Sequence, residues 1–559
     1  MESCSLRVTD SGITCSIFQK NETMGDVVNN RKYTTATWRR PVWVVILAAL
    51  ALQSCGGSGS GGGGANTDSC PGLTTGTQVG GANIKSVVHI SSSGMAPAYC
   101  KVFATIAPQT EFELRLPDIW QRRYMHMGGG GFDGKISNYD GNYLGATTAL
   151  SRGFAVVASN GGHIGSQTAV GGPLTDASWA LNNPAALADY GYRAIGTVHT
   201  AAKAITTQFY GRAPQYSYFN GCSTGGREAL IAATHFPQNY DGIIAGAPET
   251  SNSGKLLARY NIYRQLLTPG SVLPPPKIAA LESATLLACD GLDGVNDGLI
   301  SNPAACHFDP ATLRCNGADN GSCLTDAQVQ TVRTIRGPTA LADGTVVHAG
   351  FGLGAEFSPA DGVDWQPRFF GNSSTGAVSD SFWDTQSRLR YFTFNDPSYD
   401  LSSFQADRDY PLVASKNVAN GLDVDPNAFK AYAAAGKKLI LWNGASDYGI
   451  SVNQTIRFYG QMSDAVGGGV QANSFSRLFV LPGVHHCAGG VGADQFDHIS
   501  AISDWVELGT APQSLKATKS NPSTGAVQLS RPLCPYPQFP RYKGNGDVSN
   551  AENFRCATE

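Results

Sequence analysis

Short apolar runs alternate along the chain with stretches whose apolar residues have helical spacing. Four of the runs are typical of buried strands: 124–127, 154–158, 216–220 and 242–245. Between the second and the third, residues spaced three and four apart form the apolar face of one helix: Ile195, Val198, Ala202, Ile205 and Phe209. Strands that alternate with helices in this way predict βαβ units and a mostly parallel sheet.

The alternation stops at 249–437 and then resumes with the strand sequence LILW. The interrupting segment holds many turns and the aromatic-rich sequences WQPRFF and LRYFTF, which indicates a domain inserted into the sheet. A further strand at 478–481 and a closing amphipathic helix follow. The core is therefore expected in two parts, 70–248 and 438–559, with a proline-rich tail at its end.

The composition excludes two broad classes of protein. Apolar residues make up 42% of the 559 residues and glycine adds 66 more, so the chain can bury a large core and is not disordered throughout. Charged residues make up only 15%, and 40 basic against 43 acidic side chains give a net charge of -3. Because nucleic-acid-binding proteins carry a basic surface and this sequence has no basic run, we expect no nucleic-acid partner.

The amino-terminal part resembles a targeting segment. Basic residues precede an apolar run at 41–52, which is shorter than the about 20 residues of a transmembrane helix and fits a signal peptide. The sequence LQSC, ending at Cys55, resembles a bacterial lipobox, whose cysteine is lipidated; an ordinary signal peptide is the alternative. We expect a targeting segment at 1–55, a flexible linker at 56–69, and export as an outer-membrane lipoprotein, a periplasmic protein or a secreted protein.

Cysteine usage agrees with export. Of 13 cysteines, ten follow the targeting segment, and exported chains meet an oxidising compartment, so five disulfides are expected. Closeness in the sequence favours four pairs: Cys70–Cys100, Cys289–Cys306, Cys315–Cys323 and Cys534–Cys556. This leaves Cys222 and Cys487, which flank the candidate catalytic residues.

The clearest chemical motif is the sequence GCSTG at 221–225. It is a G-x-S-x-G sequence between a predicted strand and a predicted helix, which is the context of a nucleophile elbow. The glycines permit a tight turn, and the helix would direct its first N–H groups toward developing negative charge. Ser223 is therefore the candidate nucleophile, and the strand and helix around it disfavour the alternative of a chance turn.

A serine hydroxyl needs a base and an orienting acid, which α/β-hydrolases supply in the chain order Ser, Asp, His. Asp447 follows the strand LILW, and His486 follows the strand at 478–481. Such sheets place chemistry in loops at the carboxyl ends of their strands. We expect Asp447 to be the acid and His486 the base, with the adjacent His485 as the rival base.

These motifs together resemble the tannase and feruloyl esterase family. The sequences GCSTGG and HHCAGG carry the resemblance, and the tail RPLCPYPQFPRYKGNGDVSNAENFRC extends it over nearly the whole mature chain. It implies an α/β fold, the α/β-hydrolase fold, with a large inserted lid domain. It also implies a serine esterase in which Ser223, Asp447 and His486 are the catalytic residues.

The resemblance adds two further expectations about the site. The family has a disulfide between the cysteine before the serine and the cysteine after the histidine, which implies a bond between Cys222 and Cys487. Its oxyanion hole implies the backbone N–H groups of Thr224 and of Gly129 in the GGGG sequence. A glycine loop after an early strand suits this role, because a backbone N–H must approach the oxyanion closely.

The insertion contains a second candidate site in the sequence CDGLDGVNDGLI. Its carboxylates lie close together in the sequence, and the glycines between them would let two carbonyls turn inward, as Ca²⁺ prefers. The spacing is not that of an EF-hand, but the family resemblance implies a calcium loop here. An acidic turn that binds no ion is the alternative. The expected Ca²⁺ ligands are Asp290, Asp293, Val295, Asp297 and Leu299, and no organic cofactor is expected.

The expected partner is a small aromatic ester. Family members cleave esters of gallate, ferulate or terephthalate, and we favour phenolic acids such as ferulate or gallate over a terephthalate monoester. In the terephthalate branch a lid arginine binds the free carboxylate; here Ser381 stands at that place, with Arg388 and Arg390 nearby. Ile450 stands where that branch has phenylalanine. The aromatic-rich sequences of the insertion either form the core of the lid or line the pocket.

Two other functions, a ligand-binding lipoprotein and a serine peptidase, are compatible with some of these features. A catalytically inactive, calcium-stabilised surface lipoprotein that binds aromatic ligands would not need the serine, so the complete triad favours an enzyme. A serine peptidase would use the same triad, but the family resemblance favours an esterase. We expect a monomer whose only membrane contact is the N-terminal lipid anchor.

Overall fold

The computed structural model describes residues 4–9, 12–17, 70–94, 96–137, 148–165, 175–354, 356, 364–371 and 378–559. Its contacts divide the chain into two units, Met1–Ala65 and Asn66–Glu559. In the first unit, β1 (Cys4–Thr9) and β2 (Gly12–Ile17) pair as antiparallel strands. The predicted lipidation residue Cys55 and the predicted linker lie outside the described residues.

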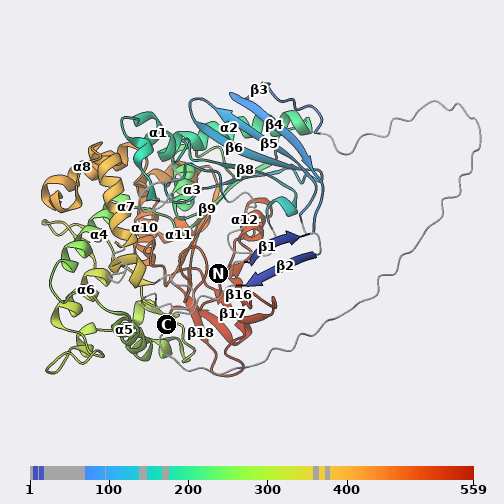
Figure 1. Cartoon of the computed structure of the whole chain (residues 1–559). Helices are drawn as coiled ribbons and strands as arrows, with labels where there is room; N and C mark the ends of the chain where they lie inside the picture. Colours follow the sequence, from blue (N-terminus) through green and yellow to red (C-terminus); the bar gives the residue numbers. More distant parts are fainter. Residues whose placement is uncertain are drawn as a thin grey trace, which may run out of the picture. The chain divides into compact units, whose positions relative to one another are not determined.

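The second unit is built on one ten-stranded sheet (Figure 1). Its strand order is β14-β13-β10-β9-β7-β8-β6-β5-β4-β3. Neighbouring strands from β14 to β8 are parallel, and those from β8 to β3 are antiparallel. The strands are β3 (Gln78–Val79), β4 (Ala82–Ile90), β5 (Tyr99–Ile106), β6 (Thr110–Pro117), β7 (Arg123–Met127), β8 (Phe154–Ser159), β9 (Tyr216–Cys222), β10 (Gly242–Gly246), β13 (Lys438–Gly444) and β14 (Ser476–Leu481).

The parallel strands correspond to the apolar runs that the sequence predicted, and both of their faces are buried. Tyr124 of β7 and Val157 of β8 belong to one hydrophobic cluster, whereas their sequence neighbours Met125 and Val156 belong to another. Because successive side chains of a strand point to opposite faces, a core covers each face of the sheet. The sheet can therefore hold the residues at its strand ends rigidly.

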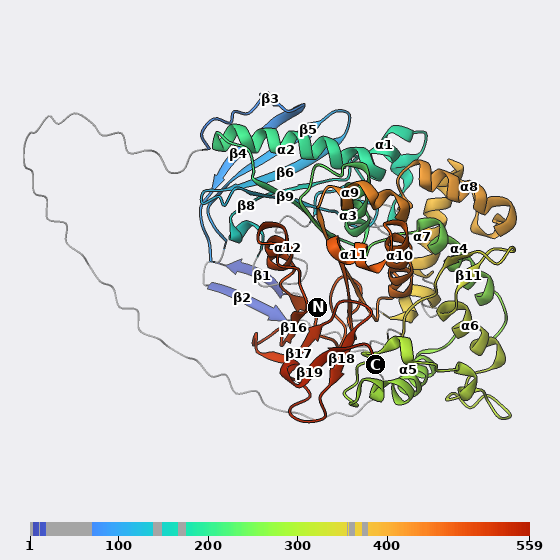
Figure 2. The ribbon, with the colours of Figure 1, turned by 180° about the vertical axis from the view of Figure 1, so that it is seen from behind.

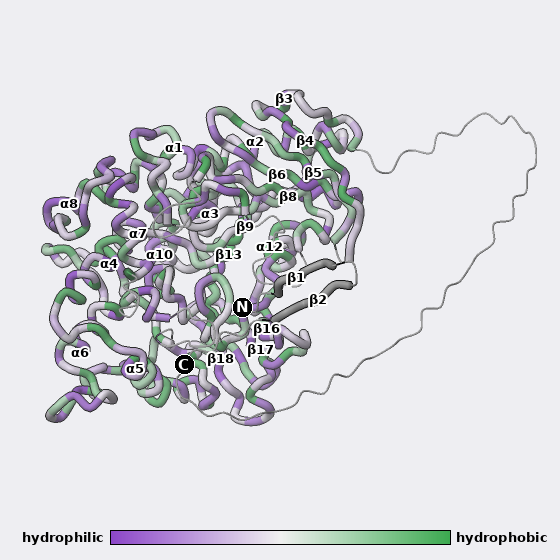
Figure 3. The backbone as a smooth tube through the Cα atoms, in the orientation of Figure 1, coloured by the Kyte–Doolittle hydropathy of each residue, from purple (hydrophilic) through white to green (hydrophobic). Residues whose placement is uncertain are grey.

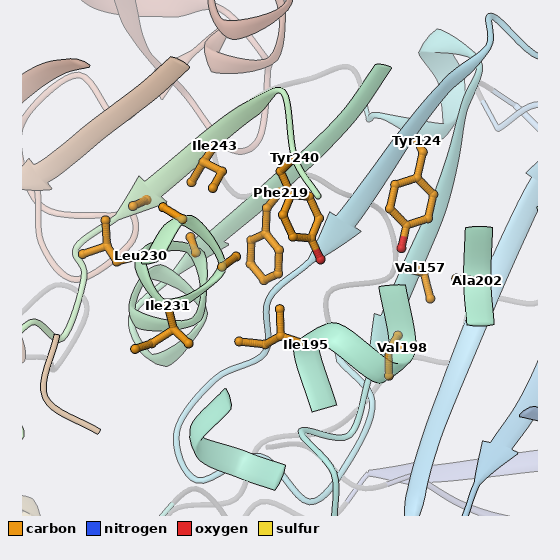
Figure 4. Packing of buried hydrophobic residues seen from close by; sticks show 14 of the residues in the cluster. Tyr124, Val157, Ile195, Val198, Ala202, Phe219, Leu230, Ile231, Tyr240 and Ile243 are labelled. Carbon is orange, nitrogen blue, oxygen red and sulfur yellow. The ribbon is translucent and has the colours of Figure 1, made fainter. Parts of the chain in front are cut away.

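Side chains from helices, and from the small sheet of β15, β16 and β17 near the end of the chain, complete these two hydrophobic clusters. Residues of α2 and α3 join the first cluster, which Figure 4 shows around Phe219 and Tyr240, and α12 joins the second. Figure 2 shows α2 running across the amino-terminal strands, and Figure 3 shows hydrophobic stretches along the sheet around β6 and β8. The helices outside the insertion are α1 (Pro184–Ala188), α2 (Ala194–Tyr210), α3 (Thr224–His235), α10 (Val452–Ala465), α11 (Gly469–Phe475) and α12 (His498–Glu507).

The segment 249–437 connects β10 to β13, which are neighbours in the sheet, and its described residues add no strand to that sheet. It packs clusters of its own, and it lies in the same compact unit as the sheet. Its elements are α4 (Asn252–Leu266), α5 (Pro275–Cys289), α6 (Asp326–Arg336), β11 (Thr339–Ala340), β12 (Val346–His348), α7 (Asp380–Arg388), α8 (Ala406–Ala419) and α9 (Lys430–Ala434).

The chain ends in two small antiparallel sheets. The first has the strand order β15-β16-β17 and the second pairs β18 with β19. Their strands are β15 (Gln495–Phe496), β16 (Leu515–Ser520), β17 (Val527–Leu533), β18 (Phe539–Tyr542) and β19 (Phe554–Ala557). With its large mixed sheet and flanking helices, the second unit fits an α/β-hydrolase-like fold.

All five predicted disulfides are present among the described residues: Cys70–Cys100, Cys222–Cys487, Cys289–Cys306, Cys315–Cys323 and Cys534–Cys556. Their number fits a chain that folds in an oxidising compartment. None of the described helices combines the length and the apolar content that crossing a bilayer requires.

Candidate active site

Ser223 occupies a sharp turn between β9 and α3. Its φ angle is 65°, a left-handed conformation that non-glycine residues rarely adopt. The flanking glycines make this turn sterically feasible, because a Cβ at Gly221 would lie 2.3 Å from the carbonyl oxygen of Gly225. The strained residue at a strand end has the geometry of a nucleophile elbow and presents its hydroxyl group above the sheet.

The structure brings the three predicted catalytic side chains into one chain of hydrogen bonds. His486 Nε2 lies 2.8 Å from Ser223 Oγ, and His486 Nδ1 lies 2.8 Å from Asp447 Oδ2. The Asp447 side chain is fully buried, and its Oδ1 accepts the backbone N–H groups of Gly449 and Ile450. These bonds fix the carboxylate, which in turn holds the imidazole in the tautomer that donates from Nδ1.

The rival histidine does not take this position. His485 is 3% exposed, and its ring lies edge-on to Tyr448 with the centroids 5.8 Å apart. The contacts with both the serine and the aspartate belong to His486. The conformation of the loop that follows β14 therefore directs His486, and not His485, toward Ser223 and Asp447.

A disulfide ties the nucleophile turn to the histidine loop. Cys222 immediately precedes Ser223, Cys487 immediately follows His486, and the two cysteine Cα atoms are 6.0 Å apart. Cys487 also has a positive φ angle of 63°. The bond joins segments separated by 265 residues at the point where the serine and the imidazole meet.

The predicted role of Gly129 is wrong in this structure, because its N–H group already donates to Glu228 Oε2 at 2.9 Å. Of the four glycines of this loop, Gly131 lines the cavity at Ser223. Thr224, the other predicted oxyanion residue, also lines this cavity, and its hydroxyl donates to Gly131 O at 2.6 Å. The predicted glycine loop therefore lies at the site, but Gly131 rather than Gly129 faces the cavity.

The cavity beside Ser223 and His486 has a volume of about 290 Å³. Its wall contains few apolar side chains, Phe132 and Ile450 among them. Seven of the fifteen lining residues are charged side chains of the insertion: Glu249, Lys255, Arg259, Arg368, Asp380, Asp384 and Arg388. A cavity built in this way favours polar or charged substrate groups over purely apolar ones.

Most of these charges are paired with one another. Lys255 contacts Glu249, and Asp384 contacts both Arg259 and Arg388. Burial and the neighbouring guanidinium groups hold the pKa of Lys255 well below its usual range. Counted at their usual charges, the four basic side chains exceed the three carboxylates by one.

Arg368 differs from the other cations of the cavity. Its guanidinium lies 5.1 Å from the centroid of the Tyr448 ring, and its Nε is buried without a hydrogen-bond partner. Among the described residues, no carboxylate lies within ion-pair distance of Arg368. An anionic group in the cavity would supply the partner that this side chain lacks.

Of the other residues that the sequence analysis placed near the substrate, some line the cavity and others do not. Arg388 and Ile450 line the cavity, whereas Ser381 and Arg390 are not among its lining residues. In the aromatic-rich sequences, Trp365 and Phe369 pack in one hydrophobic cluster of the insertion, and Leu389 and Phe392 pack in two others. Those residues form packed cores, and the residue of these two sequences that lines the cavity is the arginine within WQPRFF, Arg368.

Sequence reasoning missed Glu249, Lys255 and Arg259 as site residues. A signal was present: Glu249 follows closely on β10, whose neighbour β9 leads to the nucleophile, and Lys255 and Arg259 are spaced four apart on the following helix. That spacing places both cations on one helix face near the carboxyl edge of the sheet.

The predicted calcium loop forms one compact turn. Asp290 accepts the N–H groups of Asp297 and Gly298, and Asp297 pairs with Arg531 from β17. Asp293 Oδ2 is buried without a hydrogen-bond partner, and burial, together with the neighbouring charges, raises the pKa of Asp293 to about 6.

Backbone N–H groups of this loop bind some of its carboxylate oxygens. The N–H groups of Val295 and Leu299 donate to Asp293 and Asp297 respectively. In the described part of the chain, only Cys315, Asp319 and Cys323 bring three potential ligand atoms within 4.8 Å of one another. Their two sulfurs are joined in a disulfide, so that cluster does not hold a metal.

Fold and site together define an α/β-hydrolase-like protein with a serine, histidine and aspartate in contact. The family model described as "Tannase and feruloyl esterase" matches residues 94–557. The chain belongs to the tannase and feruloyl esterase family. It is accordingly a carboxylic ester hydrolase.

Individual relatives cover most of the chain. The mono(2-hydroxyethyl) terephthalate hydrolase of Piscinibacter sakaiensis is 33% identical, over 84% of this chain and 86% of its own length. A crystal structure of an esterase from Aspergillus oryzae superposes with a TM-score of 0.76 at 25% identity, over 87% of this chain and 99% of that one. Feruloyl esterase B from the same organism gives a TM-score of 0.72 at 25% identity, covering 86% and 98%.

Proposed function

We propose that the protein is an exported serine esterase that cleaves esters of aromatic acids through an acyl-enzyme. The observation that carries this proposal is the continuous chain of hydrogen bonds from Ser223 Oγ through His486 to the buried Asp447. A ligand-binding lipoprotein without activity would not need these contacts. They are the arrangement that turns a weak hydroxyl nucleophile into a reactive one.

In the acylation step, Ser223 Oγ forms a bond to the ester carbonyl carbon while its proton passes to His486 Nε2. The carbonyl oxygen becomes an oxyanion, and we assign its stabilisation to the N–H groups of Thr224 and Gly131. The Gly130 carbonyl accepts the Asp133 N–H at 3.1 Å, and because N–H and C=O of a trans peptide point in opposite directions, the Gly131 N–H is turned away from that bond.

Collapse of the intermediate breaks the bond to the alcohol oxygen, which takes the proton from His486. A water molecule then repeats the sequence on the acyl-enzyme: its proton passes to His486, its oxygen bonds to the carbonyl carbon, and Ser223 Oγ leaves and is reprotonated. Asp447 stabilises the imidazolium that forms in each half. The products are the free aromatic acid and the alcohol.

The acid is proposed to be phenolic, such as ferulate or gallate. Feruloyl esterase B of Aspergillus oryzae supports this class by its name and its structural likeness. The insertion acts in this account as a lid, because it supplies seven of the fifteen residues that line the cavity. Phe132 and Ile450 provide apolar surface for an aromatic ring.

A second candidate is the monoester of an aromatic dicarboxylic acid such as terephthalate. The specific observation in its favour is the excess of positive charge in the cavity, with Arg368 unpaired among the described residues. The relative from Piscinibacter sakaiensis adds support through its name. In this chain a carboxylate would meet Arg368, since Ser381 replaces the arginine expected from the resemblance.

One panel of substrates separates the candidates. The purified protein is incubated with methyl gallate, methyl ferulate, monomethyl terephthalate and a casein peptide, and the released acid or cleaved peptide is measured. Release from the phenolic esters supports the first candidate, and preferential release from the terephthalate monoester supports the second. Cleavage of the peptide alone would identify a peptidase, and no turnover of any substrate would favour a binding protein.

Arg368→Gln tests the charge selectivity of the cavity. The comparison uses monomethyl terephthalate and methyl 4-carbamoylbenzoate, which has the same shape without the charge. We expect the ratio of their kcat/KM values to fall at least about tenfold, because a hydrogen bond between charged groups contributes about 1.5–3 kcal/mol. Arg390→Gln is the matched control, since Arg390 donates to Tyr399 O and is not a lining residue. An unchanged ratio in Arg368→Gln would exclude Arg368 as the anion-binding residue.

We also propose a structural Ca²⁺ in the loop of Asp290, Asp293 and Asp297. Arg531 offsets one of the three carboxylate charges, and a divalent cation would balance the remaining two. The buried, unpartnered Asp293 Oδ2 fits a metal-facing oxygen. The ion would stabilise the fold and take no part in the chemistry at Ser223.

Removal of calcium is expected to lower the melting temperature. A ligand present at 100 times its Kd stabilises the folded state by about 2.7 kcal/mol, which chelation removes. Asp293→Ala should melt at a lower temperature than the wild type and be insensitive to the chelator. Asp343→Ala, which removes an exposed aspartate of the same insertion, should keep the wild-type response. An unchanged melting temperature on chelation, with no calcium by elemental analysis, would identify an ordinary turn.

Export is proposed from the targeting segment and supported by the five disulfides. Lipidation of Cys55 would place the enzyme on the outer membrane through the linker at 56–69. Metabolic labelling with palmitate distinguishes this lipoprotein from a chain cut by an ordinary signal peptidase, because only the lipoprotein incorporates the label.

A further inference from the structure

The glycine loop that follows β7 is bonded at two points to the helix that follows the nucleophile. The Gly129 N–H donates to Glu228 Oε2 at 2.9 Å. Two residues further on, the Gly131 carbonyl accepts the Thr224 hydroxyl at 2.6 Å. Both side chains belong to α3, which begins directly after Ser223. The segment that holds the proposed oxyanion donor is therefore bonded to the same helix that ends the nucleophile turn.

The two side chains share one face of α3, and that face lies against the loop. Thr224 and Glu228 are four residues apart, which places them one above the other on the helix, and they are 2% and 5% exposed. A Cβ on Gly225 would lie 2.7 Å from Gly129 O, and a Cβ on Gly128 would lie 2.6 Å from the Gly225 Cα atom. The helix and the loop can therefore approach this closely only because both positions are glycine.

A third bond reaches the loop from Tyr190, whose hydroxyl group donates to the Gly131 carbonyl at 3.0 Å. Tyr190 is itself bound to α3. Arg227 donates to the Tyr190 carbonyl at 3.0 Å, and its guanidinium lies 4.7 Å from the centroid of the Tyr190 ring. All three of these side-chain contacts with the loop thus depend on neighbouring residues of one helix.

The bonds lie on either side of the peptide that joins Gly130 to Gly131. The Gly129 N–H precedes this peptide in the chain, and the Gly131 carbonyl follows it. Glycine has more conformational freedom than any other residue, so an unbound glycine segment would let the Gly131 N–H point in many directions. An oxyanion donor contributes most when its direction is fixed before the reaction. Bonds on both sides supply the rigidity that the glycine sequence lacks.

We propose that Glu228 and the Thr224 hydroxyl group are positioning groups, which hold the Gly130–Gly131 peptide so that the Gly131 N–H faces the oxyanion. This inference rests on the esterase mechanism proposed above. Glu228 is not among the residues that line the cavity, and the Thr224 hydroxyl is bonded to the loop. Because the oxyanion donor acts in the transition state, loss of either bond should lower kcat and leave KM little changed.

Glu228→Met and Glu228→Gln separate the hydrogen bond from the packing. Methionine has a similar length but no strong acceptor, whereas glutamine keeps an oxygen that can accept the Gly129 N–H. We expect Glu228→Met to lower kcat at least about tenfold on the best substrate of the panel, because a whole oxyanion donor contributes about 10²–10³ in kcat. KM should change less than about twofold, and Glu228→Gln should retain at least about a third of the wild-type kcat.

Thr224→Val and Thr224→Ser test the other bond in the same way. Valine has nearly the shape of threonine without the hydroxyl group, and serine keeps that group. Thr224→Val should lower kcat at least about fivefold, a smaller loss because Tyr190 still donates to the Gly131 carbonyl, and Thr224→Ser should retain at least about a third. Thr206→Val is the matched control, since it removes a buried hydroxyl that donates to Ala202 O within α2, and its kcat should equal that of the wild type.

Phenylboronic acid gives a second readout, which a purely structural role would not change. Its boron bonds to Ser223 Oγ while the hydroxyl proton passes to His486, and the tetrahedral anion that forms resembles the transition state. Its inhibition constant should rise in Glu228→Met and Thr224→Val by about the factor by which kcat falls. Benzoate has the same ring but forms no bond to the serine, so its inhibition constant should stay unchanged.

Wild-type kcat in both Glu228→Met and Thr224→Val would overturn the inference. So would equal losses in Glu228→Gln and Thr224→Ser, or a fall in kcat with unchanged affinity for phenylboronic acid. Circular dichroism identifies a variant that does not fold, and the variants at the other position then decide; if neither Glu228→Met nor Thr224→Val folds, the contacts serve the fold and the inference is wrong. Failure of the esterase mechanism gives a different result, since Ser223→Ala would then remain active. An inactive Ser223→Ala with wild-type kcat in both variants contradicts only the positioning role.

Discussion

Ser223→Ala and His486→Ala should each lower kcat at least about 10³-fold on the best substrate of the panel. A triad acts as a unit: without the serine no acyl-enzyme forms, and without the imidazole the hydroxyl keeps its proton. In the structure, the serine and the imidazole share one hydrogen bond of 2.8 Å, so either change removes the same step. The residual activity would come from the oxyanion donors and from substrate binding alone.

The neighbouring histidine supplies the matched control. His485→Ala removes an imidazole of the same loop whose ring lies against Tyr448, so its kcat should fall far less than that of His486→Ala. Stability is measured alongside by thermal melting, because His485 is buried. Retention of more than about a tenth of wild-type turnover by both Ser223→Ala and His486→Ala would refute the catalytic assignment.

Removal of the disulfide beside the triad is expected to have the second largest effect. Cys222→Ala with Cys487→Ala should lower kcat by up to about 10²-fold, because small misplacements of reacting groups cost rate on that scale. KM should rise by a smaller factor. The bond joins the residue before Ser223 to the residue after His486, so its loss would allow the distance between Ser223 Oγ and His486 Nε2, now 2.8 Å, to vary.

The same double variant should also be less stable. Closure of a 265-residue separation contributes more, in the chain-entropy model, than the about 4.7 kcal/mol of a 100-residue loop, although native strain reduces what is realised. Kinetics are therefore measured at a temperature where circular dichroism shows the variant folded. Cys315→Ala with Cys323→Ala is the control, since it opens a separation of only 8 residues within the insertion. A folded Cys222/Cys487 variant with normal kcat would contradict the positioning role.

The parallel part of the sheet could be predicted because its strands are buried on both faces. β10 is an almost continuous apolar run, and the glycines around Ser223 identify the turn between β9 and the helix that follows it. The antiparallel strands were not predicted. β6 shows regular alternation of buried and half-buried residues, which is a weaker signal than a continuous apolar run and is typical of an antiparallel strand with one face covered.

The sequence could not identify which glycine of the loop faces the cavity at Ser223. Four consecutive glycines are chemically identical, and the choice between Gly129 and Gly131 depends on the partners that each peptide meets in space. Glu228 takes the Gly129 N–H, and Thr224 takes the Gly131 carbonyl. Both partners come from α3, beyond the reach of any local pattern.

The charged lining of the cavity could not be predicted from the sequence for a related reason. Arg259 and Asp384 lie on different helices of the insertion, and their pairing depends on how α4 packs against α7. The sequence analysis considered the aromatic residues around Arg368 as possible pocket residues. They pack inside the insertion instead, and the arginine lines the cavity. The charged lining of the cavity thus follows from tertiary packing, whereas the catalytic candidates follow from motifs at strand ends.

The central claim is that Ser223 carries the acyl group during turnover, and mass mapping of the acyl-enzyme tests it most directly. The enzyme is mixed with the best ester of the panel, quenched with acid within one turnover, and digested for peptide mass analysis. The account predicts the mass of the acyl group on the peptide that contains Ser223, and no such mass in Ser223→Ala. An acyl group on another residue, or turnover without any acylated peptide, would contradict it.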